Sequence, residues 1–432
     1  MRPREVAAWF RGSPLGGRFG RDVSWNTVSV AFLGLSGIAI TTLIGRFYGP
    51  SVLGSFNQTY VVYMLASQLS VLGLHFSVLK HVAQYGDSRT VTDPLITCAL
   101  VLSFLAAAAL ATLLFSLRHL AGQALGSPDV TVGLAYALPG VTAFAVNKVQ
   151  LMVINARRHM RAYAVYQATR YALTTTILAA AVGIGIEGSK LPAVLSIAEG
   201  ILLLCLLPYT LRLFTPVGPA QWAGWPRRHL AFGLRSFLSG VLTEANTRLD
   251  ILMLGIFLSD RIVGIYSVAA LFAEGITQLF VVLRVNVNPV LTKLHTERRV
   301  DELTALIRRG VRLTYLIMGC VLALSILGYP LFIRLLIGTP DFSASWPIFA
   351  ILAAGIASAS GYLPFKMTLI QTGNPAAHTA YLGLIAATNV FLNAALIPVF
   401  GSLGAATATA ISFATGVLYL KRLARRFAGL TI

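Results

Sequence analysis

The chain has 432 residues, of which 56% are hydrophobic and only 11% are charged, and its formal net charge at pH 7 is +19. This composition excludes a water-soluble domain, because too few polar side chains are left to cover its surface. The apolar residues fall into blocks of about 20, the length of a helix that crosses a bilayer, so the sequence predicts an integral membrane protein.

The chain begins with a basic, glycine-rich segment, residues 1–24, which reads "MRPREVAAWFRGSPLGGRFGRDVS". This segment has no apolar core of the length found in a cleaved signal peptide. We therefore expect it to lie in the cytosol, ahead of the first membrane span.

Twelve apolar blocks follow, and we interpret each as a transmembrane helix, which predicts an all-α fold. In chain order they cover residues 25–47, 55–79, 93–116, 131–155, 161–184, 189–211, 233–257, 263–291, 303–327, 343–370, 377–398 and 403–424. The blocks divide the chain into an N-terminal six-helix lobe (25–211), a cytosolic linker (212–232), a C-terminal six-helix lobe (233–426) and a tail (427–432).

The positive charges between the predicted spans are unevenly distributed. The segments on the N-terminal side of the membrane carry most of the 34 Lys and Arg residues, whereas the opposite side carries Arg46, Arg118, Lys190, Arg261 and Arg334. Because cytoplasmic loops are enriched in Lys and Arg, both termini are predicted to lie in the cytosol. The charge is then explained by topology and by contact with anionic membrane lipids, so no nucleic-acid partner is expected.

An internal repeat links the two predicted lobes. The stretch "GRFYGPSVLGSFNQTYVVYMLASQL" (45–69) aligns without a gap with "GIFLSDRIVGIYSVAALFAEGITQL" (255–279), and Gly54 matches Gly264. The copies are six spans apart, so they run in the same direction through the membrane, as in transporters built from parallel repeats around a central cavity. We expect Gly54 and Gly264 to allow a tight turn into the following helix.

Several motifs are absent from the sequence. The three cysteines, Cys98, Cys205 and Cys320, form no C-x-x-C motif and no Cys/His cluster, so we expect neither a disulfide framework nor a metal site. There is no P-loop, H-E-x-x-H motif or nucleophile elbow. We therefore expect a transporter rather than an enzyme, without a cofactor, that draws its energy from a gradient of H⁺ or Na⁺.

Eight charged residues are predicted to lie within the spans and away from either face of the membrane, where each costs about 3 kcal/mol if it is unpaired. The cations are Lys148, Arg170, Arg248 and Arg284, and the acids are Glu199, Glu244, Asp250 and Glu274. These residues must either pair with one another or line a hydrated cavity. The cations lie at different depths, an arrangement that suits an anionic head group moving across the membrane.

Each of these residues also has a purely structural interpretation. Glu244 and Arg248 are spaced i, i+4 and can neutralise each other, while Arg284 and Lys148 can extend to the inner interface. Arg170 has no acid three or four residues away and lies deepest, so it is the strongest candidate for substrate binding. The four acids are candidates for coupling or gating, or for partners of the cations.

Four stretches of the sequence resemble one known family. They are "RFYGPSVLGSFNQTYVVYMLASQLSVLGL", "TRLDILMLGIFLSDRIVGIYSVA", "YPLFIRLLIGTPDFSASWPIFAILAAG" and "NVFLNAALIPVFGSLGAATATAIS". In this order they resemble the bacterial polysaccharide flippases, a branch of the multidrug/oligosaccharidyl-lipid/polysaccharide flippase superfamily that includes the O-antigen flippases. Asp250 matches an acid often found in the second stretch, whereas Asp260 replaces the signature proline, which is Pro50 in the first copy.

The resemblance implies two six-helix lobes around a cavity that opens alternately to the cytosol and the periplasm, in the bacterial cytoplasmic (inner) membrane. The implied substrate is a polyprenyl-pyrophosphate-linked oligosaccharide, and a glycan polymerase and export machinery are candidate partners. In this hypothesis Arg170, Lys148, Arg248 and Arg284 neutralise the pyrophosphate. The alternatives are a cation-coupled multidrug exporter of the same superfamily, which needs acids in its cavity, and a non-transporting scaffold of a glycan-assembly complex.

Overall fold

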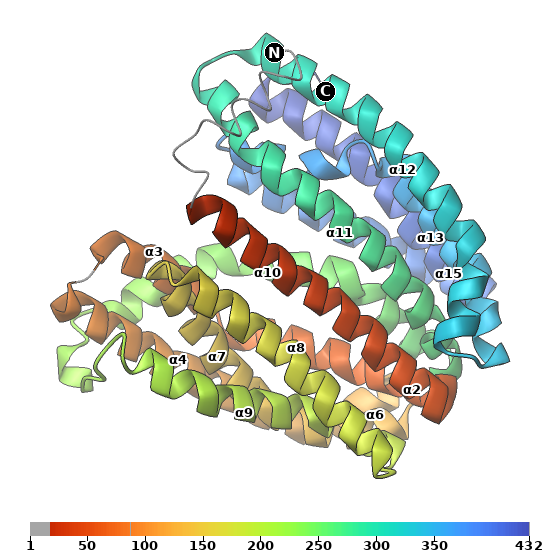
Figure 1. Cartoon of the computed structure of the whole chain (residues 1–432), viewed down its shortest axis with the longest axis horizontal. Helices are drawn as coiled ribbons and strands as arrows, with labels where there is room; N and C mark the ends of the chain where they lie inside the picture. Colours follow the sequence, from red (N-terminus) through yellow and green to blue (C-terminus); the bar gives the residue numbers. More distant parts are fainter. Residues whose placement is uncertain (1–17, 87, 432) are drawn as a thin grey trace.

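The computed structural model describes residues 18–86 and 88–431, and within these ranges the regular structure is helical and contains no strand (Figure 1). The N-terminal half contains α2 (Arg18–Ser70), α3 (Leu74–Tyr85), α4 (Arg89–Ser116), α5 (Arg118–Ala124), α6 (Pro128–Ala137), α7 (Pro139–Ala156), α8 (Met160–Gly183), η2 (Gly188–Lys190) and α9 (Ala193–Thr210). After η3 (Pro219–Gln221), the C-terminal half contains α10 (Trp225–Phe257), α11 (Asp260–Thr296), α12 (Val300–Leu336), η4 (Pro340–Ala344), α13 (Ser345–Ala359), η5 (Leu363–Phe365), α14 (Thr368–Gln371) and α15 (Pro375–Ala428). The predicted all-α fold is confirmed.

The number of membrane crossings follows from helix length, kinks and composition. In the described part of the chain, seven helices are long and apolar enough to cross a membrane, or eight if α6 and α7, bent by 46°, form one span. α2 and α15 have 53 and 54 residues and are interrupted by Gly49 (φ 81°) and Gly401 (φ 59°), so each consists of two helices. With α8 and α10, which are less apolar because they carry Arg170, Glu244 and Arg248, these helices match the twelve predicted spans.

The two halves of the chain form two groups of helices (Figure 1). α3, α4 and α6–α9 gather on one side, α11–α13 and α15 gather on the other, and α2 crosses between them. α2 packs against α8 in its own half and against α11 in the other, while α10 packs against α2, α3 and α4. The contacts of α2 with α11, and of α10 with α2, α3 and α4, join the two halves. The lobe boundaries at 211 and 233 stay a prediction.

The closest approach between the halves, which we name the outer contact, lies between α2 and α11 on the side predicted to face away from the cytosol. A Cβ atom added to Gly54 would lie 1.8 Å from the backbone oxygen of Asp260, and one added to Gly264 would lie 1.9 Å from that of Pro50. The Asp260 carboxylate accepts hydrogen bonds from Gln58 Nε2 at 2.6 Å and from Ser127 Oγ at 2.7 Å. The expected turns at Gly54 and Gly264 are wrong, since both residues are helical and their small size instead permits backbone contact.

A second contact lies where α10 begins. A Cβ on Gly73 would meet the backbone oxygen of Gly233 at 2.3 Å, so these segments also touch backbone to backbone. Nearby, His229 is fully buried, with Nε2 3.0 Å from the carbonyl oxygen of Leu95 and Nδ1 2.8 Å from Ser77 Oγ. Nε2 therefore donates to the carbonyl and Nδ1 accepts from the serine hydroxyl.

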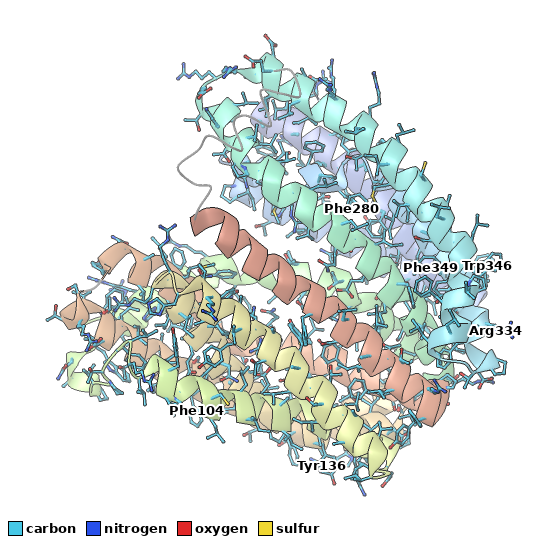
Figure 2. All side chains as sticks on the ribbon, in the orientation of Figure 1. Phe104, Tyr136, Phe280, Arg334, Trp346 and Phe349 are labelled. Atoms are coloured by element: carbon cyan, nitrogen blue, oxygen red, sulfur yellow. The ribbon has the colours of Figure 1, made fainter. Side chains whose placement is uncertain are left out.

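The outer surface of the helices is apolar, as expected for contact with lipid. Figure 2 shows Phe104 and Tyr136 on the outside of the N-terminal half and Trp346 on the outside of the C-terminal half. On α12, Leu327 is 77% exposed, and Leu316 and Leu324 are each 70% exposed. Exposed apolar area on this scale is stable only in a membrane.

We expect Gly54→Ala to lower the melting temperature of the detergent-purified protein, because the new methyl group cannot fit against Asp260 unless α2 and α11 separate. Overpacking of this kind typically costs about 1–3 kcal/mol. Gly275→Ala on α11 is the matched control, since its Cβ would meet nothing within 4 Å. Equal melting temperatures for the two variants in differential scanning fluorimetry would show that the outer contact is not tight.

Candidate functional site

Charged side chains from both halves converge around Tyr60 on α2. Tyr60 is within electrostatic reach of Arg170 from the N-terminal half and of Glu244, Arg248 and Glu274 from the C-terminal half. Lys148 on α7 is in turn within reach of Arg170 and Glu244. We name this set, completed by Glu199, the central charge cluster: Tyr60, Lys148, Arg170, Glu199, Glu244, Arg248 and Glu274.

Arg170 on α8 is paired with Glu199 on α9. Its Nε lies 2.6 Å from Glu199 Oε1 and its Nη2 donates to Oε2 at 3.3 Å, and both side chains are largely buried. Asn147 Nδ2 holds the carboxylate from the other side with a 2.8 Å hydrogen bond to Oε2, and the Phe144 ring lies 4.5 Å from the guanidinium carbon. Arg170 is thus neutralised by an acid on the next long helix. A search for acids three or four residues away in the sequence does not find this partner.

Lys148 lies deep in α7, and among the described residues its partner is an amide rather than a carboxylate. Its Nζ donates to Gln68 Oε1 at 2.5 Å and lies 5.7 Å from the Phe144 ring centroid. Within the described residues, no ion pair involves this ammonium group. This arrangement favours a polar lining over extension to the interface. It adds Gln68, which lies in the repeated stretch 45–69 and was not among the predicted site residues.

Glu244 and Arg248 on α10 form the i, i+4 ion pair that their spacing predicts, with Arg248 Nε 2.7 Å from Glu244 Oε1. The Arg248 guanidinium also lies 5.1 Å from the centroid of the Tyr60 ring, so it faces the N-terminal half. Glu274 on α11 is within electrostatic reach of Arg248 but forms no ion pair among the described residues. The cluster therefore holds three cations and three acids, and it is balanced rather than basic.

Asp250 forms local hydrogen bonds and is within electrostatic reach of Glu274. Its Oδ2 accepts a 2.5 Å hydrogen bond from the hydroxyl of Tyr266, and its Oδ1 accepts one from the backbone N–H of Ile251 at 2.9 Å. Tyr266 is fully buried, so this acid fixes α10 against α11. A coupling or gating role for Asp250 stays a prediction.

A second group of positive charges lies toward the end of the C-terminal half that is predicted to face the cytosol. Arg284 on α11 and Lys366, which directly follows η5, are within electrostatic reach of each other and of His378 on α15. In the described residues neither Arg284 nor Lys366 forms an ion pair. We name Arg284 and Lys366 the inner cation cluster, and the buried imidazole of His378 lies beside it. Sequence analysis placed Lys366 with the cytosolic charges. The helix break at Pro364 is the signal that could have identified Lys366 as a neighbour of Arg284.

The arrangement has two chemical consequences. The unpaired ammonium and guanidinium groups of Lys148, Arg284 and Lys366 can bind an anion directly, and guanidinium groups match phosphate oxygens in particular. Arg170 and Arg248 are each paired with an acid, so an anion that binds them competes with Glu199 or Glu244. Among the described residues, no group of three or more His, Cys, Asp and Glu side chains could hold a metal ion.

Comparisons with known proteins agree with this architecture. The model of the family described as polysaccharide biosynthesis protein matches residues 19–295. A curated relative, the probable flippase AglR of Haloferax volcanii, is 26% identical over 211 residues, which are 46% of this chain and 43% of the relative. The match thus spans less than half of the relative's length.

Two solved structures share the fold. Lipid II flippase MurJ in an inward closed conformation has a TM-score of 0.75 and 16% sequence identity, covering 91% of this chain and 86% of that one. A multidrug resistance MATE family transporter of the MOP superfamily, in an inward-facing conformation, has a TM-score of 0.76 and 14% identity, covering 93% and 95%. At these identities the similarity concerns the fold alone.

We expect Glu199→Gln to lower the stability of the folded protein, because it leaves the Arg170 guanidinium buried without a counter-ion. Breaking a buried pair typically costs about 3–5 kcal/mol. Glu187→Gln is the control, since the Glu187–Lys190 pair is solvent-exposed and should contribute little.

The double variant Arg170→Gln/Glu199→Gln should recover most of the loss, because no unpaired charge then remains. Thermal unfolding in detergent measures all three variants together with the wild type. If Glu199→Gln proves as stable as Glu187→Gln, the pair does not carry the structural role assigned to it.

Proposed function

Because the chain belongs to the polysaccharide biosynthesis protein family, we propose that it is a flippase that moves a polyprenyl-pyrophosphate-linked oligosaccharide across the cytoplasmic membrane. The family match carries this proposal. It is supported by the matched relative, a probable flippase, and by a fold shared with a lipid II flippase. In this proposal the membrane is bacterial and both termini lie in the cytosol, as the distribution of Lys and Arg predicts.

The pyrophosphate first binds at the inner cation cluster. Arg284 and Lys366 have no carboxylate partner to be displaced, so an anion meets no internal competitor there. Their position toward the cytosolic end of α11 and α13 suits a substrate that is assembled on the cytosolic side. Lys148, which is held by the neutral Gln68, is the next cation without an internal acid.

Transfer into the central charge cluster requires an exchange of partners. The pyrophosphate competes with Glu199 for Arg170 and with Glu244 for Arg248, because each guanidinium already forms an ion pair with its acid. A proton taken up by the displaced glutamate would remove the cost of leaving that acid unpaired in the membrane. Proton uptake would therefore favour substrate occupancy, which gives Glu199 and Glu244 a coupling role and H⁺ a role as the coupling ion.

Release on the far side requires the outer contact to separate. The backbone contact of Gly54 with Asp260, and the hydrogen bonds from Gln58 and Ser127 to the Asp260 carboxylate, must then break. All of these groups are neutral except Asp260, so water can replace each hydrogen bond at modest free energy.

We expect the variant Arg284→Gln/Lys366→Gln to reduce flipping of a fluorescent polyprenyl-pyrophosphate oligosaccharide in proteoliposomes. Loss of two charge-assisted contacts, worth about 1.5–3 kcal/mol each, predicts a decrease of about tenfold or more at subsaturating substrate. The control Lys293→Gln/Arg309→Gln removes the same charge from exposed positions on α11 and α12.

Two other results would decide against the proposal. If the wild-type protein moves organic cations but no lipid-linked glycan, it is a multidrug exporter. This alternative is consistent with the shared fold and with the three acids of the central charge cluster. If flipping is lost equally in the control variant, the effect is one of total charge and not of the inner cation cluster.

A further inference from the structure

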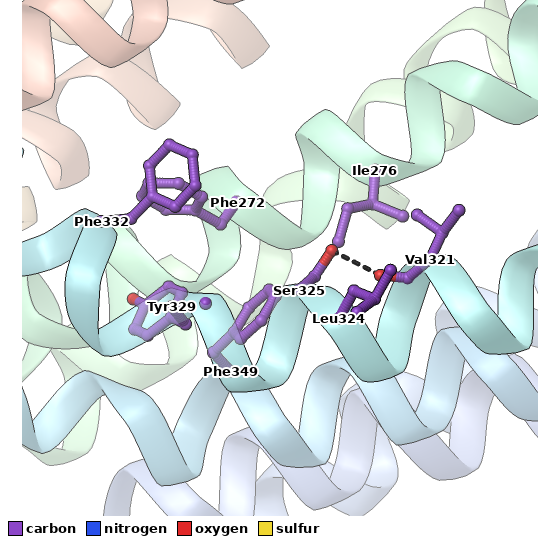
Figure 3. A pocket seen from close by; sticks show the side chains of 9 residues that line it. Phe272, Ile276, Val321, Leu324, Ser325, Tyr329, Phe332 and Phe349 are labelled. Carbon is purple, nitrogen blue, oxygen red and sulfur yellow. Dashed lines mark hydrogen bonds between the residues drawn. The ribbon is translucent and has the colours of Figure 1, made fainter.

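The C-terminal half contains an apolar pocket that the central charge cluster does not use. The pocket has a volume of about 380 Å³ and lies between α11, α12 and α13 (Figure 3). Its walls include four aromatic rings, those of Phe272, Tyr329, Phe332 and Phe349. The volume lies within the range of small-molecule sites, about 300–1,000 Å³.

The hydroxyl groups in the pocket wall are already satisfied within the protein. Ser325 Oγ donates to the backbone oxygen of Val321 at 2.7 Å, and the Tyr329 hydroxyl donates to Ser345 Oγ at 2.9 Å. A sugar or phosphate in the pocket would lose its hydrogen bonds to water without gaining new ones. The pocket therefore suits a hydrocarbon ligand.

The pocket opens toward the hydrocarbon part of the membrane. Leu324 and Phe332 line it and are themselves 70% and 55% exposed on the lipid-facing side of α12. Gly328, between them, leaves room in the wall, because a Cβ at this position would meet nothing within 4 Å. A chain lying in the membrane can therefore enter without crossing water.

An apolar stripe on α11 connects the pocket with the inner cation cluster. Phe272 and Ile276 line the pocket, and Leu279 and Leu283 follow at helical spacing on the same face, both exposed. The next residue is Arg284. The distance along the helix from Ile276 to Arg284 is about 12 Å. One amphiphile can therefore place its anion at Arg284 and Lys366 and its hydrocarbon chain along Leu283 and Leu279.

We propose that this pocket binds the isoprenoid chain of the lipid-linked substrate while the pyrophosphate occupies the inner cation cluster, an inference that rests on the proposed function. The methyl branches of an isoprenoid chain add dispersion contacts with the four aromatic rings that line the pocket. The pocket holds the first part of the chain against the protein, and the remainder lies in the bilayer.

The test uses the full-length protein in vesicles of phosphatidylethanolamine and phosphatidylglycerol. The probe is a polyprenyl monophosphate with a diazirine on an isoprene unit near the phosphate, and the labelled peptides are identified by mass spectrometry. We expect labelling of α12 between Val321 and Phe332, and competition by unlabelled polyprenyl phosphate. Equal competition by added phosphatidylglycerol, or labelling elsewhere only, would overturn the inference.

Gly328→Phe should fill the pocket and reduce this labelling by about tenfold, as expected when the burial of two or three methylene-sized groups is lost. Gly319→Phe on the same helix is the control, because its Cβ also meets nothing within 4 Å and it lies outside the pocket. If Gly328→Phe fails to fold, Gly328→Leu makes the same test with a smaller side chain. Labelling that is unchanged in a folded Gly328 variant would overturn the inference.

The flipping assay separates this inference from the proposed function. If wild type and Gly328→Phe flip the lipid-linked oligosaccharide equally well, the pocket does not hold the chain during transport although the proposed function stands. If the wild type flips no lipid-linked glycan, the proposed function fails and the pocket's assignment to a substrate chain fails with it.

Discussion

The low dielectric of the membrane sets the constraint on which the charged interior of this protein depends. An unpaired charge there costs several kcal/mol, so buried charges are either paired or placed where water and head groups can reach them. The central charge cluster obeys this rule, since Arg170 is matched by Glu199 and Arg248 by Glu244. Within the described part of this cluster Lys148 is the cation without an acid partner, whereas an anion at Arg170 or Arg248 competes with Glu199 or Glu244.

The inner cation cluster differs because it lies toward the end of the bundle that is predicted to face the cytosol. There the cost of an unpaired charge is lower, and among the described residues Arg284 and Lys366 have no carboxylate partner. At the opposite end the outer contact is built from glycine backbones and from hydrogen bonds to a single acid, Asp260. In the predicted topology an anion therefore meets unpaired cations on the cytosolic side and the Asp260 carboxylate on the outer side, which favours capture on one side and release on the other.

The sequence predicted the helical spans well, because the length and polarity of each apolar block are local properties. It predicted the Glu244–Arg248 pair for the same reason, since both residues lie on one helix. It did not predict the partner of Arg170, because Glu199 lies on a different helix and only the packing of α8 against α9 brings them together. Lys366 was placed with the cytosolic charges, because a hydropathy pattern does not show a helix break that turns a side chain back toward Arg284.

The internal repeat correctly identified Gly54 and Gly264 as equivalent positions but did not predict their structural role. Gly54 and Gly264 occupy equivalent places and do face each other's helices, but the turn before α2's second part is made by Gly49, five residues earlier. Asp260, which departs from the proline of the first copy, begins α11 and bridges to Gln58 and Ser127 of the other half. A proline has no side-chain acceptor for these hydrogen bonds, so the departure creates a polar link between the halves that the first copy cannot make.

Helix α11 unites these features because it presents a different chemistry on each face. Glu274 faces the central charge cluster, whereas Phe272 and Ile276, two residues to either side, point to the apolar pocket on the opposite face, since two residues correspond to about 200° of rotation. Near its cytosolic end Arg284 belongs to the inner cation cluster, and near its beginning Gly264 forms the outer contact. A movement of this one helix relative to α2 would therefore change the outer contact, the charge cluster and the pocket together, which is the coupling that transport of an amphiphile requires.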